Sequence, residues 1–264
     1  MSPRNNALFV LLIALSCLLP ASVSAQGMVN ASCSSQIAEA FGKTVLNDFK
    51  QTTGLNVTLH VFSSQVSINR LKNGFCELAA SALPLSPEDR KQGLVAIPIC
   101  KDPMVVIACT EIPVGDLSLT EVRRLFSGNI PNWKEVGGPD LPVRIVTPVK
   151  ETGAYVNFVR QAMGASQMKF DYQAAHSSSA VEAVSHIPGA LSFATRSVVA
   201  KYDNVKIFTI DGLEPGSEDY PYTQTFSLVT RGQPSGVVRE VLNYTLSEKA
   251  RANMTRRGLT PLIQ

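Results

Sequence analysis

The sequence predicts an α/β protein of two lobes with a ligand cleft between them, and three observations support this prediction. The chain of 264 residues is long enough for two lobes, each with its own hydrophobic core. Short apolar segments typical of strands alternate with segments of helical periodicity, which is the pattern of a mostly parallel sheet covered by helices. The alternation forms two series without a polar or low-complexity linker between them. Clefts between such lobes are favoured ligand sites.

The first series begins with a long amphipathic helix. The segment "SSQIAEAFGKTVLNDFKQTTG" (34–54) places its apolar residues on one helical face, and Gly54 ends it. A short helix is predicted over 65–74. Strands are predicted over 56–62, 76–83, 94–100 and 103–110.

The second series begins with the segment "LSLTEVRRLFSG" (117–128). Ser118 and Glu121 have the spacing of a capping box, and Gly128 ends the helix. Further helices are predicted over 152–164, 180–189, 237–246 and 247–258. Strands are predicted over 142–149, 190–195 and 204–210.

The first 25 residues predict a secretory signal peptide. The apolar run "ALFVLLIALSCLLP" is too short to span a bilayer comfortably, and small residues, "ASVSA", follow it. We expect cleavage after Ala25, so that the mature chain begins near Gln26 in the periplasm or outside the cell. The surroundings of Cys17 do not favour lipid attachment.

Charge and cysteine content narrow the function further. The chain has 24 basic and 21 acidic residues without a dense basic cluster, so no nucleic-acid partner is expected. The three histidines lack ligand spacing and no CxxC pair exists, so neither a metal nor another cofactor is expected. An even number of mature cysteines in an exported protein favours two disulfides, with the pairing left open. These cysteines are Cys33, Cys76, Cys100 and Cys109.

The segment "LSLTEVRRLFSGNIPNWKEVGG" (117–138) carries a family resemblance. It resembles the recurrent form L-[ST]-x-x-x-[LV]-x-x-[IL]-F-S-G-x-[IV]-x-x-W-x-x-[VL]-G-G of the phosphate-type periplasmic solute-binding proteins of ABC importers. The segments 211–230 and 237–262 are similar to the family's return crossover and its C-terminal helices. By this resemblance Phe126, Gly128 and Trp133 have a structural role, and the alternative is that Trp133 stacks on a ligand ring.

The resemblance implies the type II fold of that superfamily, in which each lobe is a mixed, mostly parallel sheet flanked by helices. Lobe I would comprise 26–110 and 224–264, and lobe II 111–223. The hinge crossovers would lie near 109–113 and 220–225. The protein would be a monomer that closes around its ligand by hinge motion.

The resemblance also implies how the ligand is held. Family members bind a tetrahedral oxyanion without a metal, through hydroxyl groups and the free N–H groups at helix starts. Ser34 and Ser35 could instead be plain helix caps, since capping needs only one hydroxyl. The ligand-binding residues expected here are Ser34, Ser35, Ser63, Ser64, Ser67, Glu77, Ser81, Lys150, Thr152, Gly153 and Ala154.

Several of these positions depart from the family pattern. Glu77 falls where phosphate-specific members carry aspartate, and its alternative role is that of a solvated acid at a strand end. Thr152, Gly153 and Ala154 fall on the family's S-G-T, and Lys150 is the nearest cation in place of its arginine. Three outcomes remain open: a relaxed phosphate site, a site for another small anion, and lobes that no longer bind tightly.

We therefore expect a solute-binding protein that captures a small anion and delivers it to an ABC permease. The alternative is a sensor or interaction protein on the same scaffold, which would dock on a membrane receptor. We expect no enzyme, because no G-x-S-x-G motif is present and His176 in "AAHSSSA" lies at a predicted helix start.

Overall fold

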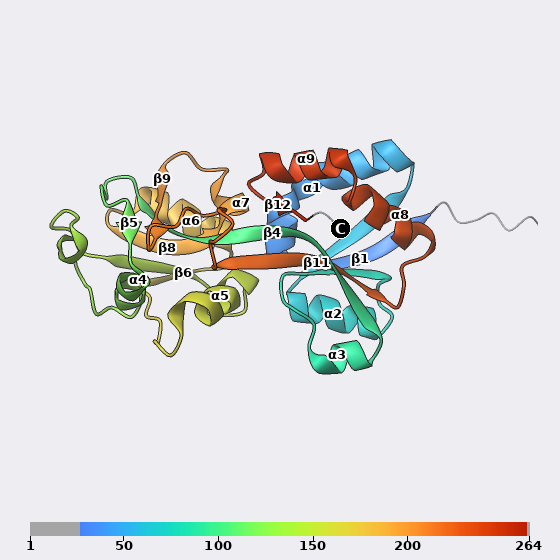
Figure 1. Cartoon of the computed structure of the whole chain (residues 1–264), viewed down its shortest axis with the longest axis horizontal. Coiled ribbons are helices and arrows are strands. Elements are labelled where there is room, and N and C mark those ends of the chain that lie inside the picture. Colours follow the sequence, from blue (N-terminus) through green and yellow to red (C-terminus); the bar gives the residue numbers. More distant parts are fainter. Residues whose placement is uncertain (1–26, 263–264) are drawn as a thin grey trace, which may run out of the picture.

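The structure, a computed structural model, describes residues 27–262, except for the side chains of 42–44. The predicted signal peptide, its cleavage site and Cys17 lie outside the described residues. Within them, none of the helices is both long and apolar enough to span a bilayer. One sheet of ten strands runs through two lobes, with the main order β2-β1-β3-β11-β4-β8-β6-β7 (Figure 1). The predicted two-lobed α/β fold is confirmed.

The strands of the main sheet are β1 (Met28–Ser34), β2 (Asn56–Phe62), β3 (Leu78–Ser81), β4 (Leu94–Cys109), β6 (Arg144–Pro148), β7 (Tyr172–Ala174), β8 (Ala190–Thr195), β9 (Val205–Ile207), β11 (Thr223–Arg231) and β12 (Thr260–Pro261). A separate pair is formed by β5 (Asp116–Leu117) and β10 (Thr209–Ile210). The helices are α1 (Ser35–Thr53), α2 (Ser64–Lys72), α3 (Pro87–Lys91), α4 (Leu119–Phe126), α5 (Gly153–Phe158), α6 (Ser177–His186), α7 (Arg196–Val199), α8 (Gly236–Thr245) and α9 (Glu248–Arg256). A 3-10 turn, η1 (Trp133–Val136), and a π-helical turn, η2 (Val159–Met163), complete the described elements.

Lobe I contains the N-terminal and C-terminal parts of the chain. In its sheet β1 is parallel to β2 and β3, and β11 is antiparallel to β3 and β4. Helices α1, α8 and α9 cover one face, while α2 and α3 cover the other (Figure 1). Gly54 ends α1 in the left-handed conformation, as predicted, with φ of 72°.

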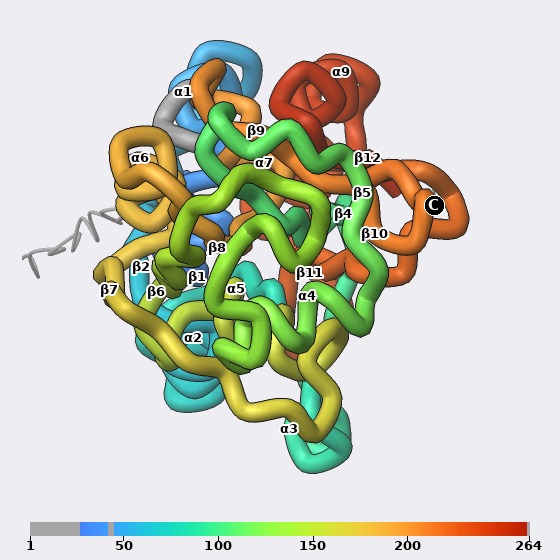
Figure 2. Tube along the Cα trace, turned by 90° about the vertical axis from the view of Figure 1, so that its left-hand side faces the viewer, coloured from blue at the N-terminus to red at the C-terminus, as the bar shows by residue number. Residues whose placement is uncertain are grey.

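Lobe II is formed by the middle of the chain. Strand β8 is antiparallel to β4 and parallel to β6, which is parallel to β7. Helices α6 and α7 lie on one face and α4 and α5 on the other, as the view from the lobe II end also shows (Figure 2). The predicted capping box at the start of α4 is present, with the Glu121 carboxylate accepting from the Ser118 backbone N–H at 2.8 Å.

Two long strands connect the lobes. The sequence predicts two strands separated near Asp102, but β4 is continuous over sixteen residues. Its first part pairs with β11, and from Met104 onward it pairs with β8 in lobe II. The first crossover therefore lies at 102–104, earlier than the predicted 109–113. The chain returns at Tyr222, whose carbonyl accepts from Met104 N at 2.7 Å.

The expected disulfides are absent among the described residues, where all four cysteines are buried free thiols. A disulfide needs Cα atoms within about 7 Å. Cys100 and Cys109 are nine residues apart on one strand, which is roughly 30 Å. Cys33 lies opposite Ala80 of the neighbouring strand, and Ala80 is four residues, or about 13 Å, along the chain from Cys76. Cys100 lies on β4, three strand spacings or about 14 Å from β1 and Cys33. Burial raises the pKa of Cys33 to about 12, so this thiol acts as a small apolar side chain.

Trp133 has the structural role that the sequence indicated. Its ring is fully buried, stacks on Phe208 with ring centroids 5.9 Å apart, and donates its indole N–H to Gly189 O at 2.9 Å. Gly128 ends α4 with φ of 70° and lets the chain turn toward this loop. A fully buried indole offers no face to a ligand, so the stacking alternative is wrong.

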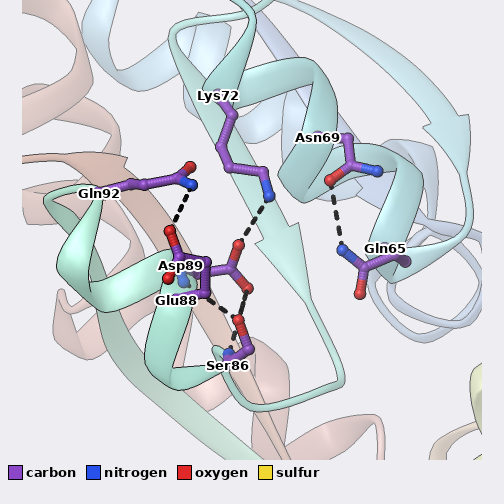
Figure 3. Close-up of polar contacts among 7 residues, drawn as sticks. All are labelled: Gln65, Asn69, Lys72, Ser86, Glu88, Asp89 and Gln92. Carbon is purple, nitrogen blue, oxygen red and sulfur yellow. Dashed lines mark hydrogen bonds and ion pairs between the residues drawn. The ribbon is translucent and has the colours of Figure 1, made fainter.

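Helix α3 is held against α2 by a buried carboxylate (Figure 3). The side chain of Asp89 accepts from Lys72 Nζ at 2.8 Å, and from the backbone N–H and the hydroxyl of Ser86 at 3.1 and 2.7 Å. Burial raises the pKa of Asp89, but these hydrogen bonds outweigh it, so the pKa is lowered overall. The ionised carboxylate therefore stabilises the fold above its ordinary pKa of 3.8, and this stability is lost as the pH falls through the lowered pKa.

We expect Asp89→Asn to lower the free energy of unfolding by about 1.5–3 kcal/mol at pH 7, because charge-assisted hydrogen bonds are lost. The difference from the wild type should shrink below pH 4. Urea unfolding at pH 7 and pH 3 measures both effects. The control is Glu88→Gln on the same helix, because the exposed Glu88 contacts only Gln92 in Figure 3. Equal stability of Asp89→Asn and the wild type at pH 7 would contradict the assigned role.

Candidate functional site

Three helix starts and one strand end meet at the seam between the lobes. Strands β1, β2 and β3 are parallel neighbours, so their carboxyl ends lie at one edge of the lobe I sheet. Helices α1 and α2 begin directly after β1 and β2. From lobe II the start of α5 approaches the same edge: a Cβ on Gly153 would lie 2.5 Å from Gln36 Oε1 and 3.9 Å from Ala82 Cβ. A side chain at Gly153 would therefore require the Gln36 carboxamide of lobe I to move.

Three of the predicted hydroxyls cap these helices. Ser34 caps α1 by accepting from Ile37 N at 3.3 Å, and Ser63 caps α2 by accepting from Val66 N at 3.2 Å. Thr152 caps α5 by accepting from Tyr155 N at 3.2 Å. Ser34 thus caps α1, and its contact with a ligand stays a prediction. Each cap leaves the other N–H groups of the first helical turn free for an anion.

The other predicted serines of lobe I lie beside the caps. Ser64 Oγ accepts from Ala82 N at 3.0 Å, which joins α2 to the end of β3. Ser81 is fully buried and its hydroxyl donates to Leu83 O at 2.8 Å. Ser67 is also fully buried, but its hydroxyl accepts from Ser32 of β1 at 3.2 Å and faces the sheet. Ser35 is half-buried beside the cap of α1.

We call the helix starts of α1, α2 and α5, with the serines beside them and the end of β3, the cluster. Two predicted residues do not lie in this cluster. Glu77 lies just before β3, where its carboxylate accepts from Asn30 N at 2.8 Å. It is four residues from Ser81, about 13 Å along the strand, because the cluster forms at the opposite end of β3. Lys150 is exposed, as is Glu151. Gly153 and Ala154 do lie at the seam, and Ala154 is fully buried.

Three amide side chains at the seam were missed by the sequence prediction. Gln36 is only 2% exposed, and neither its Nε2 nor its Oε1 has a hydrogen-bond partner within residues 27–262. Asn157, one turn after Gly153, donates to Ala82 O at 3.3 Å and to Gln224 Oε1 at 2.8 Å. Leaving a buried polar group unpaired costs about 1–3 kcal/mol. The signal was present, since Gln36 directly follows the two serines that were singled out.

A second contact joins the lobes next to the cluster. Glu39, one turn along α1, accepts from the Ser178 hydroxyl of α6 at 3.4 Å, and its backbone carbonyl accepts from Lys201. Burial raises the pKa of Glu39, although the nearby charges of His176 and Lys201 act in the opposite direction. The described lobes are therefore in contact at Gln36 and Gly153 and again at Glu39 and Ser178.

A groove of about 560 Å³ adjoins the cluster at the seam. Ala82 lines both the groove and the cluster, and strand β11 contributes Thr223 and Thr225. Two exposed arginines, Arg90 and Arg160, line the groove from the two lobes. Arg160 also donates to Asn157 Oδ1 at 2.7 Å. This arrangement puts positive charge outside the cluster and neutral hydrogen-bonding groups within it.

The chemistry of the site is that of a polar, non-metallic binding site. No group of three or more His, Cys, Asp or Glu with metal-binding geometry occurs in the part of the chain that the structure describes. Helix-start N–H groups, hydroxyls and carboxamides are suited to oxygen atoms of a small anion.

Comparison with known proteins gives three findings. The family described as "PBP superfamily domain" matches residues 20–249. The phosphate-binding protein PstS of Bacillus subtilis is 24% identical over 213 residues, which cover 75% of this chain and 71% of that protein.

Two solved structures share the fold. A substrate-binding protein assigned to a phosphate ABC transporter of Clostridium perfringens, solved with bound phosphate, has a TM-score of 0.78 at 21% identity, over 90% of this chain and all of that one. An ABC-type phosphate transport receptor of Vibrio cholerae has a TM-score of 0.72 at 20% identity, over 88% of this chain and 99% of that one.

Proposed function

The chain belongs to the PBP superfamily, and on this premise we propose that it is an extracytoplasmic solute-binding protein. It captures a small anion, phosphate or a related oxyanion, between its two lobes and delivers the anion to an ABC permease. The PstS relative is named as a phosphate-binding protein, and the two structural neighbours are named as components of phosphate ABC transport, which supports this ligand class and this partner.

The convergence of α1, α2 and α5 is the observation that carries the proposal. Each helix contributes free N–H groups and the positive end of its dipole. Lobe I contributes the starts of α1 and α2, while lobe II contributes the start of α5 at Gly153. A ligand held by all three therefore interacts with both lobes at once, and only the closed arrangement provides the complete set of donors.

Binding is coupled to hinge closure at the two strands that cross between the lobes. Opening around residues 102–104 and 222–224 separates Gln36 from Gly153 and exposes the helix starts to solvent. Arg90 and Arg160 in the adjoining groove attract an anion to the seam. Closure then presents a surface formed by both lobes to the permease. A membrane receptor in place of the permease would make the protein a sensor, and uptake of labelled phosphate by cells with and without the protein distinguishes the two.

Isothermal titration of the mature protein with inorganic phosphate tests the ligand. The protein is first unfolded and refolded to remove bound ligand, and titrations are run at pH 6 and pH 8. We expect a dissociation constant in the micromolar range or below. The double variant Thr152→Val with Gly153→Pro should abolish binding, because it removes the cap and forces a ring against Gln36. Absence of phosphate binding by the wild type, or unchanged binding by the variant, would overturn the proposal.

A further inference from the structure

Lobe I contains an apolar cavity of about 120 Å³, which we call the lobe I cavity. It lies between the sheet and the helices α1, α8 and α9 that cover one face of it (Figure 1). On the sheet side it is lined by small side chains of adjacent strands, Ala31 and Cys33 of β1 and Ala80 of β3, with Cys33 opposite Ala80. Protein interiors have few voids larger than one water molecule. The lobe I cavity is instead close in size to apolar cavities of about 150 Å³ that take up benzene.

The helix side of the lobe I cavity is aromatic and carries little charge. Phe41 and Phe49 line it from α1, and Phe49 packs edge-on against the ring of Tyr244 on α8, with ring centroids 5.3 Å apart. Within the described residues, the only charged side chain in its lining is Arg257, which donates to Ala40 O at 3.3 Å. Phenyl rings favour an aromatic guest, and an apolar lining disfavours an ionised one. The lobe I cavity is therefore suited to a neutral aromatic ring.

The Tyr244 hydroxyl gives this lining a polar group. Tyr244 is only 7% exposed, and its hydroxyl has no hydrogen-bond partner among the described residues. The Thr245 hydroxyl, in the same lining, already donates to Val241 O at 2.7 Å. Burial raises the pKa of Tyr244 and the nearby Asp48 raises it further, so the phenol keeps its proton and can donate it. A buried hydroxyl of this kind needs an acceptor atom on a ligand.

We propose that the lobe I cavity is a binding site for a small neutral phenol, a single aromatic ring with one hydroxyl group. The ring packs against Phe41, Phe49 and the small side chains of the sheet, and its oxygen accepts a hydrogen bond from the Tyr244 hydroxyl. None of the anion-binding residues expected from the sequence belongs to the described lining of the lobe I cavity. The site is therefore a second one, beyond the proposed function.

Phenol and toluene are the probes, because they have nearly the same size and differ only by a hydroxyl in place of a methyl group. Titration of the mature protein followed by NMR gives both dissociation constants, and the backbone signals that shift locate the site. We expect phenol to bind with a dissociation constant of about 1 mM or below, which is within reach of a ligand this small. The largest shifts should surround Cys33 and Tyr244.

Tyr244→Phe tests the polar contact, since it keeps the ring and removes the hydroxyl. The ratio of phenol affinity to toluene affinity should fall by about 5-fold or more, because one hydrogen bond is lost. The matched control is Tyr202→Phe, which removes a hydroxyl that donates to Ser178 O at 3.2 Å in lobe II and should leave both affinities unchanged. Ala31→Leu fills the lobe I cavity and should abolish binding of both probes.

The outcomes decide the inference without reference to phosphate. A wild type that binds neither probe, or that shows its largest shifts away from Cys33 and Tyr244, overturns it. An unchanged ratio of affinities in Tyr244→Phe, or unchanged binding in a folded Ala31→Leu, also overturns it. If Ala31→Leu does not fold, the ratio in Tyr244→Phe decides. Failure here leaves the proposed function standing, and a wild type that binds phenol but no phosphate overturns only the proposed function.

Discussion

Replacing Trp133 by alanine is expected to lower the free energy of unfolding by about 3–5 kcal/mol. The indole is fully buried in the lobe II core and stacks on Phe208. Its removal leaves a large cavity and also leaves Gly189 O without the indole donor. The backbone around it fixes a turn, since Trp133 N donates to Leu141 O and Gly138 N donates to Trp133 O, both at 2.9 Å.

Urea unfolding followed by circular dichroism measures this loss, because Trp133 is the only tryptophan and fluorescence would lose its probe. Trp133→Phe is the control: it keeps most of the apolar contact and removes the N–H group, so about 1–2 kcal/mol should be lost. Phosphate affinity of the folded fraction should not change, because the Trp133 ring and its N–H group contact Phe208 and Gly189 of lobe II. A loss below 1 kcal/mol in Trp133→Ala would contradict its role in the lobe II core.

The parts of the fold that the sequence predicted well are those specified by local interactions. The capping box of Ser118 and Glu121 and the left-handed stop at Gly54 are determined by a few adjacent residues. The continuity of β4 was missed because Lys101, Asp102 and Pro103 resemble a loop. The structure buries Asp102 there by pairing it with Ser197, ninety-five residues away. No local pattern predicts such a partner.

The candidate site was likewise predicted only where local sequence patterns mark its residues. Ser34, Ser63 and Thr152 lie at helix starts, which cap residues reveal directly. Glu77 was placed by its position in a motif, but strand register puts it at the opposite end of β3 from Ser81. Gln36, Asn157 and Gln224 become visible only when the lobes are brought together, since each depends on contacts between distant segments.

Asp102 is the buried carboxyl group at the point where β4 crosses between the lobes. It is fully buried, and its oxygens accept from the backbone N–H and hydroxyl of Ser197 at 3.2 and 2.5 Å. Burial raises its pKa from 3.8 to about 7, against the opposing effects of Ser197, Thr195 and Arg196. Because the folded-state pKa is raised, the favourable contribution of the protonated form is complete below pH 3.8. It is lost as the pH rises through 7.

We expect Asp102→Asn to be more stable than the wild type by about 2–4 kcal/mol at pH 8, because a shift of one pKa unit corresponds to about 1.4 kcal/mol. The asparagine keeps an acceptor for Ser197 N and removes the buried charge. The difference should decrease through pH 6 and vanish near pH 4, as measured by urea unfolding at each pH. Asp89→Asn has the opposite sign, since it is destabilising at neutral pH and neutral in acid, and it serves as the matched control. If Asp102→Asn is less stable than the wild type at pH 8, then Ser197 and Arg196 hold Asp102 ionised, and the crossing between the lobes is built around a stable buried charge.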